Sequence, residues 1–435
     1  MLKDWFPKGS LRRVIAGNTV SQLIGRIVSS VTIVIVSLLI AQKFGPEGYG
    51  DFVKITTYVG FFYLLADFGL NAVYLQRTVT KNGALSKTSS DQWRLLLGLR
   101  LVVSAVLVVV ALVILSFFPH TLGQGYTPLV RLGIILLVPV IIAQAITTTT
   151  NALFQKMLRY DYSTNAQNVG SFFLVTTALV LTILSPISGP LLGVVSVFMG
   201  SLATAIVALY LVQRKLPVIR PTFNVGQFLG LLNESAPLGL ALVFNLIYFH
   251  SDSVILALSR STEEVGIYGL AYKVFELPLV VPIFFMNAVY PLLLQAQGGN
   301  PGGQRVIFIR SLQFLLLSSL TLILGLWFAA PLVTFVRPDF AASVAPLRVL
   351  IIGLPIFFVS ALFMWFIIAQ KQLVALLIIH GIAMLANIIG NIVLIPVYGY
   401  MAAAWITVGS EFFVLVATSF YVLPRVYLTD QKTMS

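Results

Sequence analysis

The chain has 435 residues, of which 58% are hydrophobic and 9% are charged, and its formal net charge is +13. A composition this apolar excludes a soluble globular protein and indicates a polytopic membrane protein. Because the sequence contains no cysteine, disulfide, thiol and Cys-based metal chemistry are also excluded.

Apolar runs of about 20 residues recur along the chain, and a helix of that length crosses the roughly 30 Å hydrocarbon core of a bilayer. The predicted fold class is therefore an all-α polytopic membrane protein with about twelve transmembrane helices. We place the spans near residues 14–41, 48–76, 94–117, 128–154, 163–184, 190–212, 228–258, 265–295, 306–335, 344–369, 372–396 and 400–424.

The first predicted span follows the segment MLKDWFPKGSLRR, which resembles a basic, aromatic anchor at the membrane surface. The span lacks the short apolar core and cleavage site of a secretory signal, so we expect it to stay in the mature protein. Asn18, Gln22 and Arg26 form a polar stripe on it at helical spacing, with Arg26 near the bilayer centre. An ionisable residue at that depth predicts a functional site. The alternative is an arginine that pairs with a nearby carboxylate to fix helix packing.

Lys54 lies on the second span, about 9 to 12 Å below its outer end. The alternative to a functional role is a side chain that extends to the outer interface. Asp67 falls on nearly the opposite face of the same helix. Because Asp67 is close in sequence to Arg77 at the cytoplasmic end, we predict a packing or gating ion pair there.

The seventh span contains Pro237, a predicted kink, and Asn245, a candidate cavity residue. Glu234 lies near the cytoplasmic end of this span. His250 and Asp252 lie near its outer end, where we expect them to be exposed.

The eighth span, in the stretch VGIYGLAYKVFELP, contains Lys273 and Glu276. Their spacing of three residues allows them to pair along one helix. Glu276 is either a simple partner of Lys273 or a group that holds it and responds to protonation. Glu411 in the last span has no evident partner in the sequence.

Lysine and arginine are unevenly distributed over the connections between spans. Alternate connections, beginning with the N-terminal segment, contain most of them, whereas the others contain Lys43, Arg260 and Arg337. This positive-inside pattern predicts that both termini are cytoplasmic. We expect the multi-pass chain to lie in the cell's inner (cytoplasmic) membrane. Since topology accounts for most of the basic excess, we expect no nucleic-acid partner.

Short sequence matches relate the two halves of the chain at a nearly constant offset. They pair YGDFVK at Tyr49 with YGLAYK at Tyr268, NAVYLQ at Asn71 with NAVYPL at Asn287, Gln155 with Gln370, and Gly189 with Gly399. We therefore predict two six-helix lobes, residues 1–216 and 217–435. An even number of spans in each lobe implies a pseudo-two-fold axis along the membrane normal, with the substrate site at the lobe interface.

The repeat maps Lys54 onto Lys273, so we expect the two lysines to face each other across a central cavity. Together with Arg26 they would form an electropositive pocket suited to a phosphate or diphosphate.

Enzymatic signatures are missing from the sequence. It has no G-x-x-x-x-G-K-[ST] phosphate loop and no His-x-x-x-His pair, and the connections are too short for a soluble catalytic domain. We therefore predict a transporter that uses no cofactor and no metal.

The run NTVSQLIGRIVSSVTIVIVSLLIAQKFGPEGYGDF, followed by ADFGLNAVYLQRTV, resembles a known family. It is similar to the polysaccharide-exporting branch of the multidrug/oligosaccharidyl-lipid/polysaccharide (MOP) exporter superfamily, the O-antigen or capsule repeat-unit flippases. VGIYGLAYKVFELP and PVYGYMAAAWITVGSEF resemble later helices of the same family.

The resemblance implies alternating-access transport of a polyprenyl-diphosphate-linked oligosaccharide from the cytoplasmic to the outer leaflet. In the related lipid II flippases, basic residues on the first, second and eighth helices line the cavity. Arg26, Lys54 and Lys273 lie on the matching helices of this chain. Because those relatives have fourteen helices and this chain about twelve, the residues are matched by helix and depth and not by alignment. Membrane lipids and polysaccharide polymerase machinery are further implied partners.

Two other classes stay open. A cation-coupled small-molecule or multidrug exporter of the same superfamily should offer carboxylates in its cavity. A membrane enzyme acting on the same sugars would need a sizeable outer loop.

Overall fold

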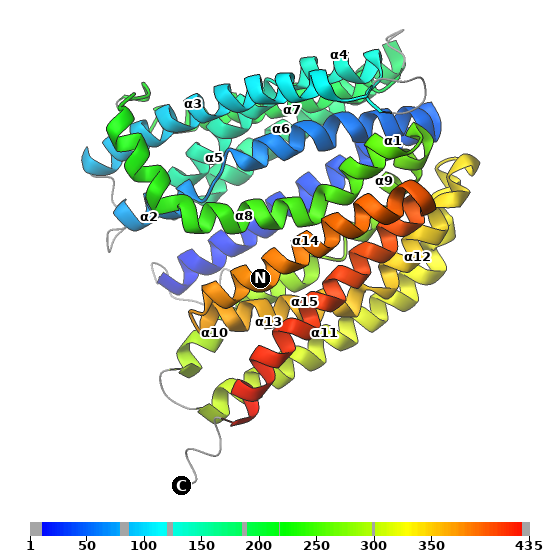
Figure 1. The fold of residues 1–435 in the computed structure, drawn as a ribbon. Helices are drawn as coiled ribbons and strands as arrows, with labels where there is room; N and C mark the ends of the chain where they lie inside the picture. Colours follow the sequence, from blue (N-terminus) through cyan, green and yellow to red (C-terminus); the bar gives the residue numbers. More distant parts are fainter. Residues whose placement is uncertain are drawn as a thin grey trace. The chain divides into compact units, whose positions relative to one another are not determined.

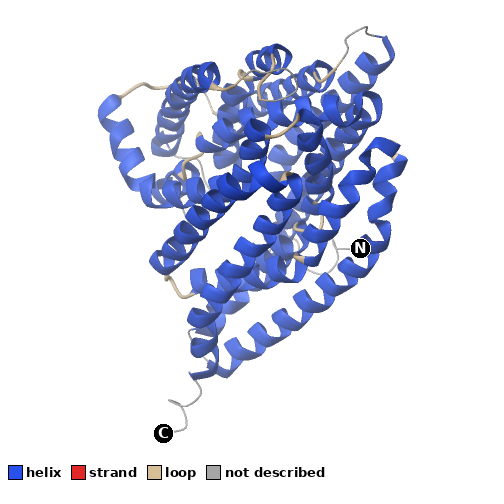
Figure 2. Ribbon diagram, turned by 45° about the vertical axis from the view of Figure 1, so that its right-hand side comes forward, coloured by secondary structure: helices blue, strands red, loops and turns tan. Residues whose placement is uncertain are grey.

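The structure is a computed structural model that describes residues 11–78, 87–119, 125–184, 189–216, 218–297 and 301–428. Helices joined by loops and turns make up these residues, with no strand among them, which confirms the predicted all-α class (Figure 2). In chain order the elements are α1 (Leu11–Leu65), α2 (Leu70–Thr78), α3 (Lys87–Phe117), α4 (Pro128–Leu137), α5 (Val140–Lys156), α6 (Tyr160–Leu184), α7 (Leu191–Gln213), α8 (Val225–Ser259), α9 (Thr262–Glu276), α10 (Val280–Gln297), α11 (Pro301–Ala329), η2 (Ala330–Phe335), η3 (Pro338–Ser343), α12 (Val344–Ile352), α13 (Leu354–Ala369), α14 (Leu373–Tyr398) and α15 (Tyr400–Leu428) (Figure 1).

The membrane spans agree with the hydropathy of the sequence. In the described part of the chain, 11 helical stretches are long and apolar enough to cross a membrane. One of them, Val28–Thr78, is 51 residues long and has a break at Gly45, where φ is 70°. Because about 20 residues suffice for one span, this stretch holds two, and the predicted number of about twelve is confirmed.

Several spans consist of two helices joined by a short break. The second predicted span is interrupted by Phe68 and Gly69, with φ of 39° and 69°. The fourth, eighth and tenth predicted spans are interrupted between α4 and α5, α9 and α10, and α12 and α13. Pro139 and Pro278 lie in two of these breaks, as expected for a residue that cannot donate a helical hydrogen bond.

The helices group into two compact units. The first unit takes the chain up to Phe44 and again over Asp51–Leu246, and the second takes Gly45–Gly50 and the chain from Ile247 onward. In the first unit, α7 packs against α5 and α6, and α3 packs against α5. In the second unit, α15 packs against α13 and α14, and α13 packs against α11. The lobe boundary predicted between residues 216 and 217 concerns the internal repeat and stays a prediction.

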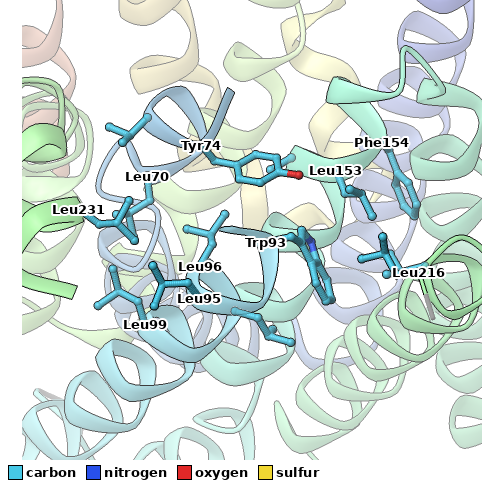
Figure 3. Packing of buried hydrophobic residues seen from close by; sticks show 14 of the residues in the cluster. Leu70, Tyr74, Trp93, Leu95, Leu96, Leu99, Leu153, Phe154, Leu216 and Leu231 are labelled. Carbon is cyan, nitrogen blue, oxygen red and sulfur yellow. The ribbon is translucent and has the colours of Figure 1, made fainter. Parts of the chain in front are cut away.

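The first unit has an aromatic and aliphatic core. The side chain of Trp93 on α3 is fully buried, and its indole Nε1 donates a hydrogen bond to the Thr149 carbonyl at 3.0 Å. Tyr74, Leu153 and Phe154 are also buried in this cluster (Figure 3). Burying an aromatic ring together with its polar group requires such a partner, so Trp93 fixes α3 on α5.

Candidate functional site

Three of the predicted site residues lie on the first part of α1. Asn18, Gln22 and Arg26 are helical, but their side chains lie outside the part of the chain that the structure describes. Their role in a basic pocket therefore stays a prediction.

Lys54 is buried inside the first unit. Its side chain is 1% exposed, and Nζ donates a hydrogen bond to the Gly125 carbonyl at 2.8 Å. Arg131 donates to the neighbouring carbonyls of Tyr126 and Phe118 at 3.1 and 2.7 Å. Lys54 and Arg131 thus bind backbone carbonyls on both sides of the α3–α4 connection, in the part of it that the structure describes. Because Gly125 belongs to the connection that precedes α4, both the functional role of Lys54 and its interfacial alternative stay predictions.

Lys273 and Glu276 form an ion pair at the end of α9. Lys273 Nζ lies 2.6 Å from Glu276 Oε2, and the side chains are 31% and 37% exposed. The pairing predicted from their spacing is confirmed. The pair stands directly before the break at Pro278, inside the candidate span Thr262–Leu294. A partly exposed cation within a membrane span is a candidate functional group.

The predicted pairing of Asp67 with Arg77 is wrong. Asp67 Oδ1 accepts a hydrogen bond from Arg100 Nη2 at 2.6 Å, and Arg77 pairs with Glu234 on α8, with Nη2 and Oε1 2.5 Å apart. The Phe68–Gly69 break separates Asp67 from the helix that carries Arg77, so helical spacing does not relate the two.

Arg100 was missed in the sequence, although an arginine inside LLLGLRLVVS is a visible signal. Its side chain is fully buried on α3, and Nη1 also donates to Asn71 Oδ1 at 2.8 Å and Thr149 Oγ1 at 3.3 Å. The arginine therefore joins α3, α5 and both sides of the α1–α2 break.

Pro237 lies inside α8, which stays helical through it. The residues that follow pack against the α1–α2 break. A Cβ on Gly239 would lie 2.7 Å from the Phe68 ring, and one on Gly69 would lie 3.0 Å from Leu238. Pro237 thus stands next to a helix-packing contact of the first unit. Asn245 lies on the same helix and is exposed.

Asp252 is buried rather than exposed as predicted. Its side chain is 2% exposed on α8, and its carboxylate accepts hydrogen bonds from Tyr268 Oη at 2.5 Å and Thr407 Oγ1 at 3.2 Å. The prediction of exposure was based on the position of Asp252 near the end of its span. It is wrong because residues of α9 and α15 cover this face of α8.

A second polar network lies beside it in the same unit. Asn387 Oδ1 accepts from Ser251 Oγ at 2.7 Å and from Asn391 Nδ2 at 2.8 Å, and Asn387 Nδ2 donates to Ser410 Oγ at 2.7 Å. Asn391 Oδ1 is buried without a hydrogen-bond partner among the described residues. The two asparagines, four residues apart in LANIIGNIVLI, were the available sequence signal.

Glu411, which had no evident partner in the sequence, is held by hydroxyl groups. Tyr248 Oη donates to its Oε2 at 2.8 Å, and Ser360 Oγ donates to its Oε1. The described residues contain no group of three or more His, Cys, Asp or Glu that could hold a metal ion. Buried carboxylates with hydroxyl donors can instead take up and release a proton or a weakly bound monovalent cation.

Comparison with known families supplies the deciding observation. A family model with the description "Polysaccharide biosynthesis protein" matches residues 11–297. The chain belongs to this family. A search of curated protein sequences gave no match.

Solved structures show that this family member has the fold of the MOP superfamily. The structure of the lipid II flippase MurJ in an inward closed conformation is similar, with a TM-score of 0.73 at 14% identity, over 92% of this chain and 87% of that one. An inward-facing MATE family multidrug resistance transporter of the MOP superfamily matches with a TM-score of 0.74 at 14% identity, over 92% and 96% of the two chains. A MOP superfamily transporter from Pyrococcus furiosus, described as having a binding pocket of reverse polarity, matches with a TM-score of 0.60 at 13% identity, over 96% of each chain.

Proposed function

We propose that this family member is a flippase for a polyprenyl-diphosphate-linked oligosaccharide, such as an O-antigen, capsule or exopolysaccharide repeat unit. It moves the sugar-diphosphate head from the cytoplasmic to the outer leaflet by alternating access, while the lipid tail stays in the bilayer. It acts in the inner membrane with both termini cytoplasmic, alongside polysaccharide polymerase machinery, and it catalyses no covalent step.

The family match carries this proposal, because it ties a membrane protein with a transporter fold to polysaccharide biosynthesis. Lipid II flippase is the stated function of one structural relative. The physical requirement is an accessible cation that can bind a diphosphate inside the membrane. Lys273 meets it, because its side chain is 31% exposed and a ligand phosphate can compete for its pairing with Glu276.

The three basic residues of the proposed pocket have different parts in this mechanism. Lys273 binds the diphosphate directly, and Arg26 is a second contact by its depth on the first span. Lys54 donates to a backbone carbonyl in the state described, so it contributes only in a conformation that releases Gly125. Asp252 and Glu411 are the groups through which an ion gradient is coupled to the cycle.

A cation-coupled small-molecule exporter is the second candidate. Two buried carboxylates in the second unit favour it, since the side chains of Asp252 and Glu411 are 2% and 7% exposed and accept hydrogen bonds from hydroxyl groups. The same carboxylates serve ion coupling in a flippase, so they do not decide between the two functions.

Native mass spectrometry of protein purified from a glycan-producing host separates the candidates. The wild type is expected to carry a polyprenyl-diphosphate sugar adduct, and Lys273→Ala is expected to lose most of it, because the accessible cation is gone. Lys43→Ala is the matched control: Lys43 is exposed and donates to the Thr182 carbonyl, so its adduct should equal that of wild type.

An adduct of equal abundance in Lys273→Ala would remove this lysine from the site and direct attention to Arg26. If the wild type binds organic cations and no lipid-linked sugar, the exporter is the correct function.

A further inference from the structure

The connection between α7 and α8, which lies wholly in the first unit, carries exposed cations and exposed apolar side chains together. It contains three basic residues and no acidic one. Its exposed cations are Arg214, Lys215 and Arg220. The exposed apolar side chains of the connection and of the first residue of α8 are Val218, Phe223 and Val225, which are 43%, 62% and 73% exposed. We call residues 214–216 and 218–225 the linker strip.

The linker strip is held on the first turns of α3 by backbone contacts. The Thr222 amide donates a hydrogen bond to the Arg94 carbonyl at 3.0 Å, and Arg94 Nε donates to the Arg220 carbonyl at 2.9 Å. A Cβ on Gly98 would lie under 3.0 Å from the Thr222 carbonyl oxygen, so the strip lies directly against α3. At the other end of the strip, Leu216 is buried in the core cluster of the first unit (Figure 3). The cations and apolar side chains are therefore presented by a backbone with a fixed position.

The length of α3 indicates the depth at which the linker strip docks. Helix α3 has 31 residues, and at 1.5 Å per residue its length of about 46 Å matches the hydrocarbon core together with the headgroup layers. The apolar run of α3 begins directly after Arg94. Because Thr222 contacts α3 at Arg94 and at Gly98, on either side of this boundary, we infer that the strip lies where headgroups meet acyl chains.

Two cations of the linker strip stack on tyrosine rings. The Arg214 guanidinium lies 4.6 Å from the ring centroid of Tyr210 on α7, and Lys215 Nζ lies 5.6 Å from that of Tyr162 on α6. An aromatic ring orients a cation without cancelling its charge, as a carboxylate partner would. Tyrosine is also typical of the interface between membrane and water. The strip thus offers oriented positive charge at the depth of the headgroups.

We propose that the linker strip binds anionic phospholipids, with Arg214, Lys215 and Arg220 contacting headgroup phosphates and Phe223 contacting acyl chains. The three cations select an anionic headgroup. The exposed apolar side chains need a hydrocarbon neighbour, which a nucleic acid, an acidic peptide or a soluble phosphate does not supply. The charge pattern predicts that these lipids belong to the cytoplasmic leaflet. The site is independent of the transported substrate.

Native mass spectrometry of the full-length protein tests this site. Delipidated protein in detergent is mixed with equimolar phosphatidylglycerol and phosphatidylcholine, and each bound lipid is quantified. The strip variant removes three charges through Arg214→Gln, Lys215→Gln and Arg220→Gln. The matched control removes three other exposed cations at the same predicted side of the membrane, through Arg310→Gln, Lys371→Gln and Arg425→Gln.

The wild type is expected to prefer phosphatidylglycerol, and the strip variant should bind it about 100-fold more weakly, because each cation near an anionic headgroup contributes about fivefold. The control variant should bind it like the wild type. An equal loss in both variants would show that binding follows the overall charge of the protein, and would overturn the site. Equal binding of the two lipids by the wild type would also overturn it.

Phe223→Ser tests the apolar part of the linker strip while every cation is kept. The side chain is 62% exposed, so the variant is expected to fold even if the triple variants do not. It should weaken phosphatidylglycerol binding by about fivefold or more, because the ring no longer contacts acyl chains. Unchanged binding in Phe223→Ser, or displacement of the lipid by glycerol 3-phosphate, would identify a site for soluble phosphates and overturn the lipid assignment.

The lipid site and the proposed flippase function are tested separately, because phosphatidylglycerol and a polyprenyl-diphosphate sugar differ in mass. Phosphatidylglycerol binding that depends on the linker strip supports the site whether or not the protein carries a sugar adduct. A sugar adduct without such binding supports the flippase and overturns the site.

Discussion

At the residue scale, the two partners of the Asp67–Arg100 ion pair differ in burial, so removing one should destabilise the protein more than removing the other. The Arg100 side chain is fully buried, whereas Asp67 is 38% exposed. Removing the carboxylate leaves a buried cation with its main partner gone, which costs about 3–5 kcal/mol. Removing the cation leaves a carboxylate that is already 38% exposed, which costs less. Asp67→Asn should therefore lower the melting temperature of the purified protein more than Arg100→Met.

The exposed pair Arg77–Glu234 is the control for this comparison, because its side chains are 30% and 52% exposed. Arg77→Gln should leave the melting temperature nearly unchanged, as expected for a surface ion pair. A larger loss in Arg100→Met than in Asp67→Asn would mean that Arg100 acts through packing rather than charge.

Residue pairs were predictable from the sequence only within one helix. The Lys273–Glu276 pair follows from its spacing. The partners of Asp67 and Asp252 lie on other helices, at sequence separations that no periodicity specifies. Lys54 shows the same limit, since its bond to the Gly125 carbonyl depends on how the connection between α3 and α4 folds back.

At the element scale, the predicted repeat has counterparts in the helix boundaries. The break at Val138 between α4 and α5 and the break at Gly353 between α12 and α13 stand at the same offset as Gln155 and Gln370. Gly189 and Gly399, which the repeat pairs, have φ of 81° and 62°, and each precedes the last helix of its half. Such agreement supports the repeat, because turns with positive φ are fixed by local sequence.

The turn at Gly399, between α14 and α15, allows a prediction about stability. Its φ of 62° and ψ of −148° suit glycine almost alone, and a Cβ would lie under 3.0 Å from Glu264 Oε2. Gly399→Ala should destabilise the protein by roughly 1–3 kcal/mol and lower its melting temperature. Gly409→Ala on α15 has open space for its Cβ and should be neutral or slightly stabilising. Equal melting temperatures for the two variants would contradict the assigned backbone conformation.

At the scale of the whole molecule, hydropathy predicted the spans well, because a bilayer requires long apolar helices whatever their packing. It could not predict the division into units. Helix α8 is continuous, yet it contributes to the first unit up to Leu246 and to the second from Ile247, and α1 contributes Gly45–Gly50 to the second. The repeat is defined by the order of residues along the chain, whereas a compact unit is defined by which helices pack together. The boundaries of the units therefore differ from those of the repeat, and the sequence alone does not show where.

The orientation of the whole chain in the membrane follows from its charge pattern and is testable with single cysteines. Gln42 and Gln213 are exposed near opposite predicted ends of their spans. The positive-inside pattern places Gln42 outside and Gln213 in the cytoplasm. An impermeant maleimide added to intact cells should therefore label Gln42→Cys and spare Gln213→Cys, and permeabilised cells should show both. The reverse labelling would invert the topology, and with it the direction of transport.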